Sequence, residues 1–174
     1  MVRIKSPRAY RITPATILIG ISIILSSSFT RQLVDYAKAH IGKRGFAVLM
    51  QVILGVVALA FVIFRSRKRT SMRTTVLFVI VFTVGLMMNL RIKNVVEQVH
   101  LFEYGVLGWY ACRDLIRGQR KAAGIALAIL VCVLAGISDE LFQLFIPGRY
   151  CAVSDMMLNA MGGIWGVCLY LGSR

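Results

Sequence analysis

The stretch EQVHLFEYG contains four residues whose side chains can bind a ligand or move a proton: Glu97, His100, Glu103 and Tyr104. At about 100° per residue, their spacing places them within an arc of roughly 120° on one helix. An ionisable side chain at mid-bilayer costs about 2.5–3.5 kcal/mol, and less near the surface. Three such groups on one face therefore need partners or water, which favours a site. The alternative is that Glu97 lies among head groups and that His100 is a packing residue.

A second polar stretch, SDELFQLFIPGR, follows a long uncharged run. Asp139, Glu140 and Gln143 fall within an arc of about 100° on a helix. Two adjacent carboxylates in a medium of low dielectric favour keeping one proton between them, which suits proton transfer near neutral pH. The turn signal at 147–148 ends the helix and presents Arg149, the only basic residue of this connection. Arg149 suits capture of a phosphate or carboxylate, and an ion pair that closes the bundle is the alternative.

The third polar stretch, SDMMLNAMGGIWG, opens the last apolar segment. Ser154 or Asp155 is a plausible helix N-cap, which is the structural alternative to a binding role for Asp155. Asn159 lies further along the helix, and Gly162 and Gly166 continue its stripe in a GxxxG spacing that lets two membrane helices approach closely. This stripe is expected to face the interior of a bundle. Asn159 is then either a hydrogen-bonding link between helices or a ligand-binding residue.

The elements that position these residues are predicted to be membrane-spanning helices. The chain of 174 residues is 58% hydrophobic and only 16% charged, whereas about a quarter of the residues in a soluble domain are charged. Spanning the hydrocarbon takes about 20 residues, with roughly 17 as the lower limit. Six segments qualify, namely 12–29, 46–64, 74–90, 95–112, 122–146 and 156–172. We therefore predict an all-α polytopic transmembrane helical bundle that forms a single membrane domain, residues 1–174.

The formal net charge of +14 is interpreted as an orientation signal, and nucleic acid is not expected as a partner. Fourteen Lys and Arg residues lie at the two termini and in the second and fourth connections, against seven in the other connections. The positive-inside rule then places both termini in the cytoplasm, although the basic first connection reduces the contrast. With this topology all three polar stretches lie near the outer leaflet. The N-terminal apolar run is expected to be an uncleaved signal anchor.

Four cysteines are spread through the second half of the chain: Cys112, Cys132, Cys151 and Cys168. They form no CxxC pair, which disfavours a disulfide framework or a cysteine metal cluster. We interpret them as small apolar residues in or near the membrane.

The three polar stretches together resemble the VanZ-like (teicoplanin-resistance) family. The matching motifs are ExxHxxEYGxLG at 97–108, SDExxQxFxPGR at 138–149 and SDxxxNxxGxxxG at 154–166. The VanZ-like core covers about 75–172. This resemblance implies a small multispanning protein of the bacterial cytoplasmic (inner) membrane, with a link to antibiotic resistance through glycopeptide susceptibility. It implies no particular reaction.

The leading functional hypothesis is an outward-facing polar pocket that binds or modifies an anionic, lipid-linked molecule of the cell envelope. Arg149 would hold phosphate or carboxylate, and His100 with Glu103 or Glu140 would move a proton. The candidate catalytic residues are His100, Glu103, Asp139 and Glu140, and the candidate binding residues are Glu97, Tyr104, Gln143, Arg149, Asp155 and Asn159. Membrane lipid and a phosphorylated lipid-linked ligand are the expected partners. Whether the protein is an enzyme stays open at this point.

Two other classes of function fit the same residues. A proton- or ion-coupled transporter also uses intramembrane carboxylates and histidine, but the cytoplasmic half of the last three spans is nearly bare of polar residues. A non-catalytic protein that binds a ligand at the surface would need only the pocket. As cofactor, a divalent ion (Mg²⁺, Mn²⁺ or Zn²⁺) is compatible with one histidine and several carboxylates, whereas a structural zinc site is disfavoured by the single histidine.

Overall fold

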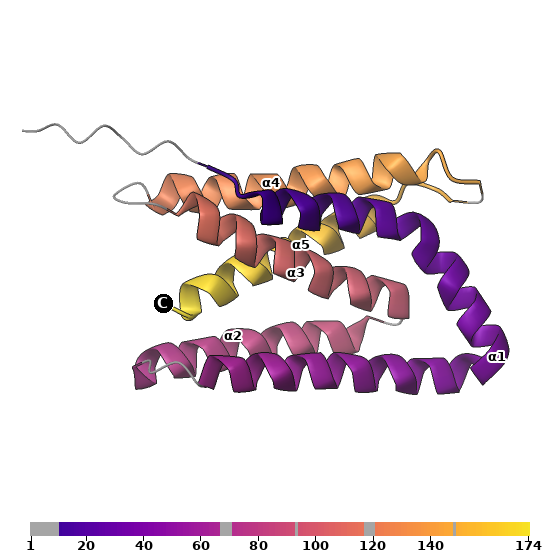
Figure 1. Ribbon diagram of the computed structural model, residues 1–174, viewed down its shortest axis with the longest axis horizontal. Coiled ribbons are helices and arrows are strands. Elements are labelled where there is room, and N and C mark those ends of the chain that lie inside the picture. The colour runs from indigo at the N-terminus through magenta and orange to yellow at the C-terminus, as the bar shows by residue number, and fades with distance from the viewer. Residues whose placement is uncertain (1–10, 67–70, 93, 117–120, 148) are drawn as a thin grey trace, which may run out of the picture.

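A computed structural model describes residues 11–66, 71–92, 94–116, 121–147 and 149–174 (Figure 1). These residues form five helices and no strand: α1 (Pro14–Ser66), α2 (Met72–Arg91), α3 (Val95–Leu115), α4 (Lys121–Gln143) and α5 (Val153–Gly172). The predicted all-α fold class is confirmed. Three helical segments are long and apolar enough to cross a membrane, Gln32–Val57 within α1, α2 and α4, and Pro14–Ser26 is a shorter apolar helix.

The sequence predicts two spans joined by a connection at 30–45, and α1 covers both of them. Its 53 residues are two helices that meet at a kink at Gly42, where the backbone leaves the helical region (φ 73°, ψ 159°). The kink lies inside the predicted connection, and the rest of that connection is helical. The expected loop contains no proline, and its Leu, Gln, Ala and Lys residues are good helix formers. A straight helix of this length would measure about 80 Å, against a hydrocarbon core of about 30 Å.

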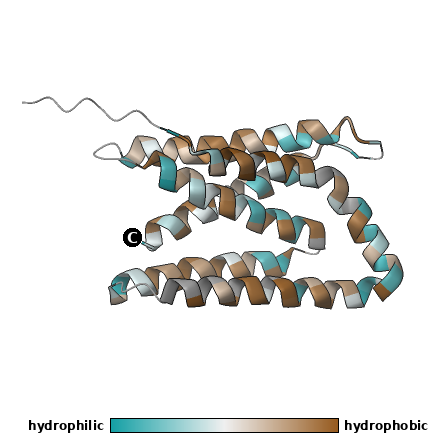
Figure 2. Ribbon diagram, in the orientation of Figure 1, coloured by the Kyte–Doolittle hydropathy of each residue, from teal (hydrophilic) through white to brown (hydrophobic). Residues whose placement is uncertain are grey.

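Helix α1 therefore bends. It runs along the bundle, crosses one end obliquely and returns in the opposite direction (Figure 1). Hydrophilic residues gather where α1 bends, and its returning part is mostly hydrophobic (Figure 2). The first part of α1 contributes Ile23 to a core cluster with Tyr104, Leu107 and Cys132. The bend thus lies at the end where α3 and α5 begin and α4 ends (Figure 1), which we call the polar end.

Helices α3 and α5 pack backbone to backbone through glycines. A Cβ atom on Gly166 would overlap the carbonyl oxygen of Gly105, and one on Gly108 would overlap the carbonyl oxygen of Gly163. A Cβ atom on Gly162 would lie 2.7 Å from the carbonyl oxygen of Leu101. The prediction that another helix backbone approaches Gly162 and Gly166 is confirmed, and that helix is α3. This close contact fixes α3, which carries His100, against α5, which carries Asn159.

Helix α2 packs against α5 through Trp165. The indole Nε1 of Trp165 donates a hydrogen bond of 2.9 Å to the carbonyl oxygen of Val81. A Cβ atom on Gly85 would overlap the indole ring. Phe78 and Phe82 of α2 belong to the same buried cluster as Trp165. A glycine on α2 thus makes room for the largest side chain of α5.

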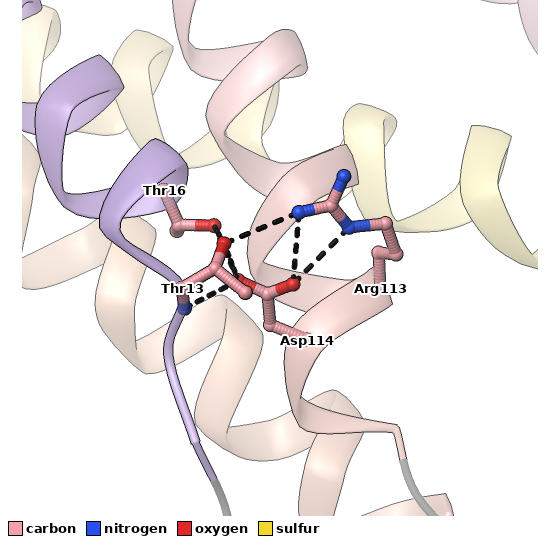
Figure 3. Close-up of polar contacts among 4 residues, drawn as sticks. All are labelled: Thr13, Thr16, Arg113 and Asp114. Carbon is pink, nitrogen blue, oxygen red and sulfur yellow. Dashed lines mark hydrogen bonds and ion pairs between the residues drawn. The ribbon is translucent and has the colours of Figure 1, made fainter.

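The end opposite the polar end is held by a cluster around Asp114, which joins the start of α1 to the end of α3 (Figure 3). Asp114 Oδ2 accepts hydrogen bonds from the backbone nitrogen of Thr13 (2.8 Å), Thr13 Oγ1 (2.6 Å) and Thr16 Oγ1 (2.6 Å). Arg113 donates to Oδ1 from Nε (3.1 Å) and from a terminal nitrogen (3.0 Å).

Asp114 lies beyond the predicted span 95–112 and is 2% exposed. Burial alone would raise the pKa of this carboxyl. The hydrogen bonds from Thr13, Thr16 and Arg113 outweigh burial and lower the pKa to about 2. The ionised carboxylate therefore fixes the start of α1, because it binds the backbone N–H and the hydroxyl of Thr13, the residue before the helix, and the hydroxyl of Thr16 in its first turn. The sequence held one signal for it: Asp114 is the only acidic residue among the basic residues expected at this end.

Candidate functional site

The polar end buries side chains from three helices next to one another. Six of them are at most 9% exposed: His100 and Tyr104 of α3, Asp139, Glu140 and Gln143 of α4, and Asn159 of α5. Tyr104 Oη lies 3.5 Å from Asp139 Oδ2, a long hydrogen bond between α3 and α4. A Cβ atom on Gly136 would lie 3.0 Å from Asn159 Cβ and 3.7 Å from the Tyr104 ring. Gly136, one turn before Glu140, lets the three helices meet here.

His100 and Glu103 form a pair on α3. His100 Nδ1 lies 3.2 Å from Glu103 Oε2, which is within ion-pair range. The geometry is not that of a hydrogen bond, and Nδ1 has no hydrogen-bond partner among the residues that the structure describes. His100 is 9% exposed, whereas the Glu103 side chain is 28% exposed. A buried imidazole is thus next to a carboxylate that reaches the surface, an arrangement that can pass a proton between the interior and water.

Glu140 has both carboxylate oxygens engaged. Oε1 accepts a hydrogen bond from Gln143 Nε2 at 3.1 Å, and Oε2 accepts one from the backbone nitrogen of Ala152, also at 3.1 Å. Ala152 is the N-cap residue of α5 and makes no capping bond with its own side chain. Glu140 therefore joins the end of α4 to the start of α5, and it fixes both ends of the connection that carries Arg149.

The expected N-cap at Ser154 or Asp155 is wrong, because α5 begins at Val153 and is capped one residue earlier. Asp155 lies in the first turn of α5 and accepts a hydrogen bond of 3.1 Å from the hydroxyl of Ser154. A carboxylate in the first turn of a helix interacts favourably with the helix dipole. Asp155 is partly buried at the rim of the polar end.

Glu97 also lies at the rim, at the start of α3. Its Oε1 accepts a hydrogen bond of 3.0 Å from Asn94 Nδ2, an exposed contact. Asn94 is the N-cap of α3, and its Oδ1 accepts from the backbone nitrogen of Val96 at 3.1 Å. The contacts of Glu97 thus belong to the helix start, and Asn94 was not singled out in the sequence.

Arg149 is partly buried in the connection between α4 and α5. It lies close enough to His100 for its charge to act on the imidazole, as does the charge of Asp139. The charges of three side chains therefore act on the His100 imidazole: Glu103, Asp139 and Arg149.

Two buried nitrogen atoms of the polar end lack hydrogen-bond partners within the described part of the chain: His100 Nδ1 and Asn159 Nδ2. Leaving a buried polar group unsatisfied costs about 1–3 kcal/mol. Such groups are commonly satisfied by water or by a ligand. Asn159 Nδ2 can only donate, and the protonated imidazole donates from both nitrogens. An acceptor-rich guest, such as an anion, would satisfy Asn159 Nδ2 and would share the protonated imidazole with Glu103, which lies 3.2 Å from Nδ1.

No group of three or more His, Cys, Asp or Glu side chains among the described residues is placed to hold a metal ion. Both carboxylate oxygens of Glu140 already accept hydrogen bonds, from Gln143 and from the backbone of Ala152.

The fold and this cluster define a polytopic helical membrane protein with a buried imidazole, phenol and carboxylates at one end of its bundle. The family model described as VanZ/LLP1 matches residues 8–173. The chain belongs to the VanZ/LLP1 family, which confirms the resemblance seen in the three polar stretches. Comparisons with curated proteins and with solved structures gave no match.

Proposed function

We propose that this VanZ/LLP1 protein binds or modifies an anionic, lipid-linked molecule of the cell envelope at the polar end. Two observations carry the proposal. The buried Asn159 Nδ2 has no hydrogen-bond partner among the described residues, and the buried His100 imidazole, paired with Glu103, lies near the charge of Arg149. Two donors and a guanidinium are a suitable set for a phosphate or carboxylate. Membership of the family is consistent with a role in glycopeptide susceptibility.

The residues of the polar end have different roles in this proposal. Arg149 attracts the anion, and Asn159 orients it through a hydrogen bond. His100 donates to the anion or transfers a proton, with Glu103 as its 3.2 Å partner. Glu140 is a positioning residue, because its two oxygens hold the connection that carries Arg149. Tyr104 and Asp139 close the interior side of the cluster.

The proposal places the polar end on the outer face of the bacterial inner membrane, with both termini in the cytoplasm. The excess of Lys and Arg at the opposite end, fourteen against seven, supports this orientation. A transporter would need polar residues that continue towards the opposite end. The buried acid there, Asp114, has its oxygens engaged by Thr13, Thr16 and Arg113, which favours binding over transport.

The test is to identify the lipid that co-purifies with the wild-type protein, with Arg149→Ala and with Arg91→Ala. Arg91 is an exposed basic residue in the last turn of α2, at the same end of the bundle, and it controls for loss of charge. We expect mass spectrometry to find a phosphorylated lipid with the wild type and Arg91→Ala. Arg149→Ala should lose it. Equal amounts with all three proteins, or none with any, would contradict the proposal.

A further inference from the structure

A second feature of the molecule lies on the face of α5 turned away from the polar cluster. Helices α2 and α5 enclose an open groove of about 340 Å³. Its walls are apolar and include Ile80, Val84 and Met88 from α2 and Met161 and Ile164 from α5. None of these residues takes part in the site described above.

The floor of the groove is Trp165. This residue is 7% exposed, and its ring is held against α2 by the space at Gly85. The indole N–H, its only polar group, is used by the carbonyl oxygen of Val81 at 2.9 Å. The floor is therefore rigid and offers no hydrogen-bond donor, so the groove suits a hydrocarbon guest.

The α5 wall of the groove continues to the polar end. Val153, Met157, Met161 and Ile164 are spaced four, four and three residues apart, so they form one stripe along α5. Their exposure falls along the stripe, from 69% and 63% to 45% and 42%. The stripe extends for about 16 Å, from the connection that carries Arg149 into the groove. At this depth a membrane-spanning bundle is surrounded by hydrocarbon.

We propose that the groove between α2 and α5 holds the single hydrocarbon tail of the lipid whose anionic head group binds at the polar end. This inference rests on the proposed function and names its ligand class, a polyprenyl-type monophosphate with one chain. One groove near the lower limit of ligand-pocket volumes holds one chain, and a diacyl phospholipid would leave its second chain outside. Met88 and Met161 are flexible side chains that adapt to an irregular, methyl-branched guest.

Photolabelling tests the location of the tail. The full-length protein in phosphatidylcholine nanodiscs is given a long polyprenyl monophosphate with a diazirine within the first few isoprene units from the phosphate. We expect the label on peptides from α2 or α5 that contain residues 80–88 or 161–168, and we expect excess unlabelled polyprenyl monophosphate to remove it. A label concentrated on Gln32–Val57 of α1 would overturn the proposal. Equal competition by phosphatidic acid would overturn the assignment to a single-chain lipid.

Two matched tryptophan substitutions test the groove by affinity. Val84 lies in the groove and Val79 lies on another face of α2, and their exposures are nearly equal at 48% and 49%. Val84→Trp should weaken binding of the long polyprenyl monophosphate about tenfold through the apolar contact it displaces, and Val79→Trp should leave binding unchanged. Dimethylallyl monophosphate, which has the same head group and only one isoprene unit, should bind both variants equally. If Val84→Trp does not fold, Ile164→Trp replaces it.

Binding measurements on Arg149→Ala distinguish failure of the groove proposal from failure of the proposed function. If Arg149→Ala weakens both probes and Val84→Trp weakens neither, the head-group site stands and the groove proposal falls. If neither probe depends on Arg149, the proposed function falls, and this inference falls with it.

Discussion

Glu103 and Glu140 both lie near the His100 imidazole, but their different surroundings indicate different roles. Glu140 is 1% exposed and uses both oxygens within the protein. Glu103 is partly exposed and faces His100 alone among the contacts described above. The sequence predicted both as possible proton carriers, because spacing along a helix shows which face a residue occupies but not which backbone N–H it meets. The bond from Glu140 to Ala152 joins residues 12 positions apart.

Glu140→Gln is therefore expected to destabilise the protein more than Glu103→Gln. An amide at position 140 turns one acceptor into a donor facing either Gln143 or the N–H of Ala152. Leaving such a buried group unpaired costs about 1–3 kcal/mol. Glu103→Gln should change the melting temperature little, because position 103 reaches water. Thermal melting of the purified variants in detergent measures both, and equal melting temperatures would show that Glu140 has no positioning role.

At the scale of elements, the sequence predicted the limits of four helices closely, and it predicted a loop where α1 has only a kink at Gly42. Helices α2 to α5 begin and end within about three residues of the predicted spans, because apolar length and turn signals such as 147–148 mark their limits. The first two spans were separated by a loop, since charged residues interrupt hydrophobic runs. Charge does not break a helix, however, and only Gly42 adopts a non-helical backbone.

For the close contact between α3 and α5, the sequence predicted the glycines on the α5 side but not those on the α3 side. The GxxxG spacing of Gly162 and Gly166 indicated a close helix contact. Its partner, Gly105 and Gly108 on α3, lies in the polar motif, where those glycines were noted only as part of the pattern. Similarly, Gly136 of α4, just before the second polar stretch, admits Tyr104 and Asn159.

Gly166→Leu should destabilise the bundle, because a Cβ atom there overlaps the backbone of α3. Overpacking typically costs about 1–3 kcal/mol, and a rigid backbone leaves little room for adjustment. Gly55→Leu is the matched control, since Gly55 is exposed in α1 and no atom lies within 4 Å of its ideal Cβ position. Melting curves should show a loss for Gly166→Leu alone. A Gly166→Leu protein that melts like the wild type would contradict this packing.

The hydrogen bonds of Asp114 predict that the contact between the start of α1 and the end of α3 becomes less stable in acid. The pKa of Asp114 is about 2 in the folded protein, below the value of about 3.9 for an unfolded chain. The ionised carboxylate therefore stabilises the fold at pH values above about 4, and this contribution disappears as the pH falls towards 2. Asp114→Asn should melt lower than wild type at neutral pH and lose less stability between pH 4 and 2.

Asp35→Asn serves as the control for the Asp114 prediction, because Asp35 is exposed in α1. The melting temperature of Asp35→Asn should follow that of the wild type across the same pH range. A parallel decline of all three proteins on acidification would show that Asp114 does not supply the linkage.

At the scale of the whole molecule, the buried ionisable groups separate into a large cluster at the polar end and a small one at the opposite end. Asp139, Glu140 and His100 gather where α4 ends and α5 begins (Figure 1). Asp114 lies at the end of α3, where it is bound by Thr13, Thr16 and Arg113. Local sequence predicted the cluster at the polar end, because each polar stretch begins or ends an apolar segment. It could not predict the groove between α2 and α5, which depends on how Trp165 fits Gly85 across 80 residues of chain.

The orientation of the bundle decides which side of the membrane the polar end faces. In a cysteine-free background, Tyr150→Cys and Lys121→Cys place single exposed thiols at opposite ends of α4. Native Cys112 is unsuitable because it is fully buried. The excess of Lys and Arg in the segments at the end of Lys121 predicts that this end lies in the cytoplasm. An impermeant maleimide added to intact cells should therefore label Tyr150→Cys alone, and both proteins after lysis. Labelling of Lys121→Cys alone would place the polar end in the cytoplasm, where its ligand would have to be a lipid of the inner leaflet.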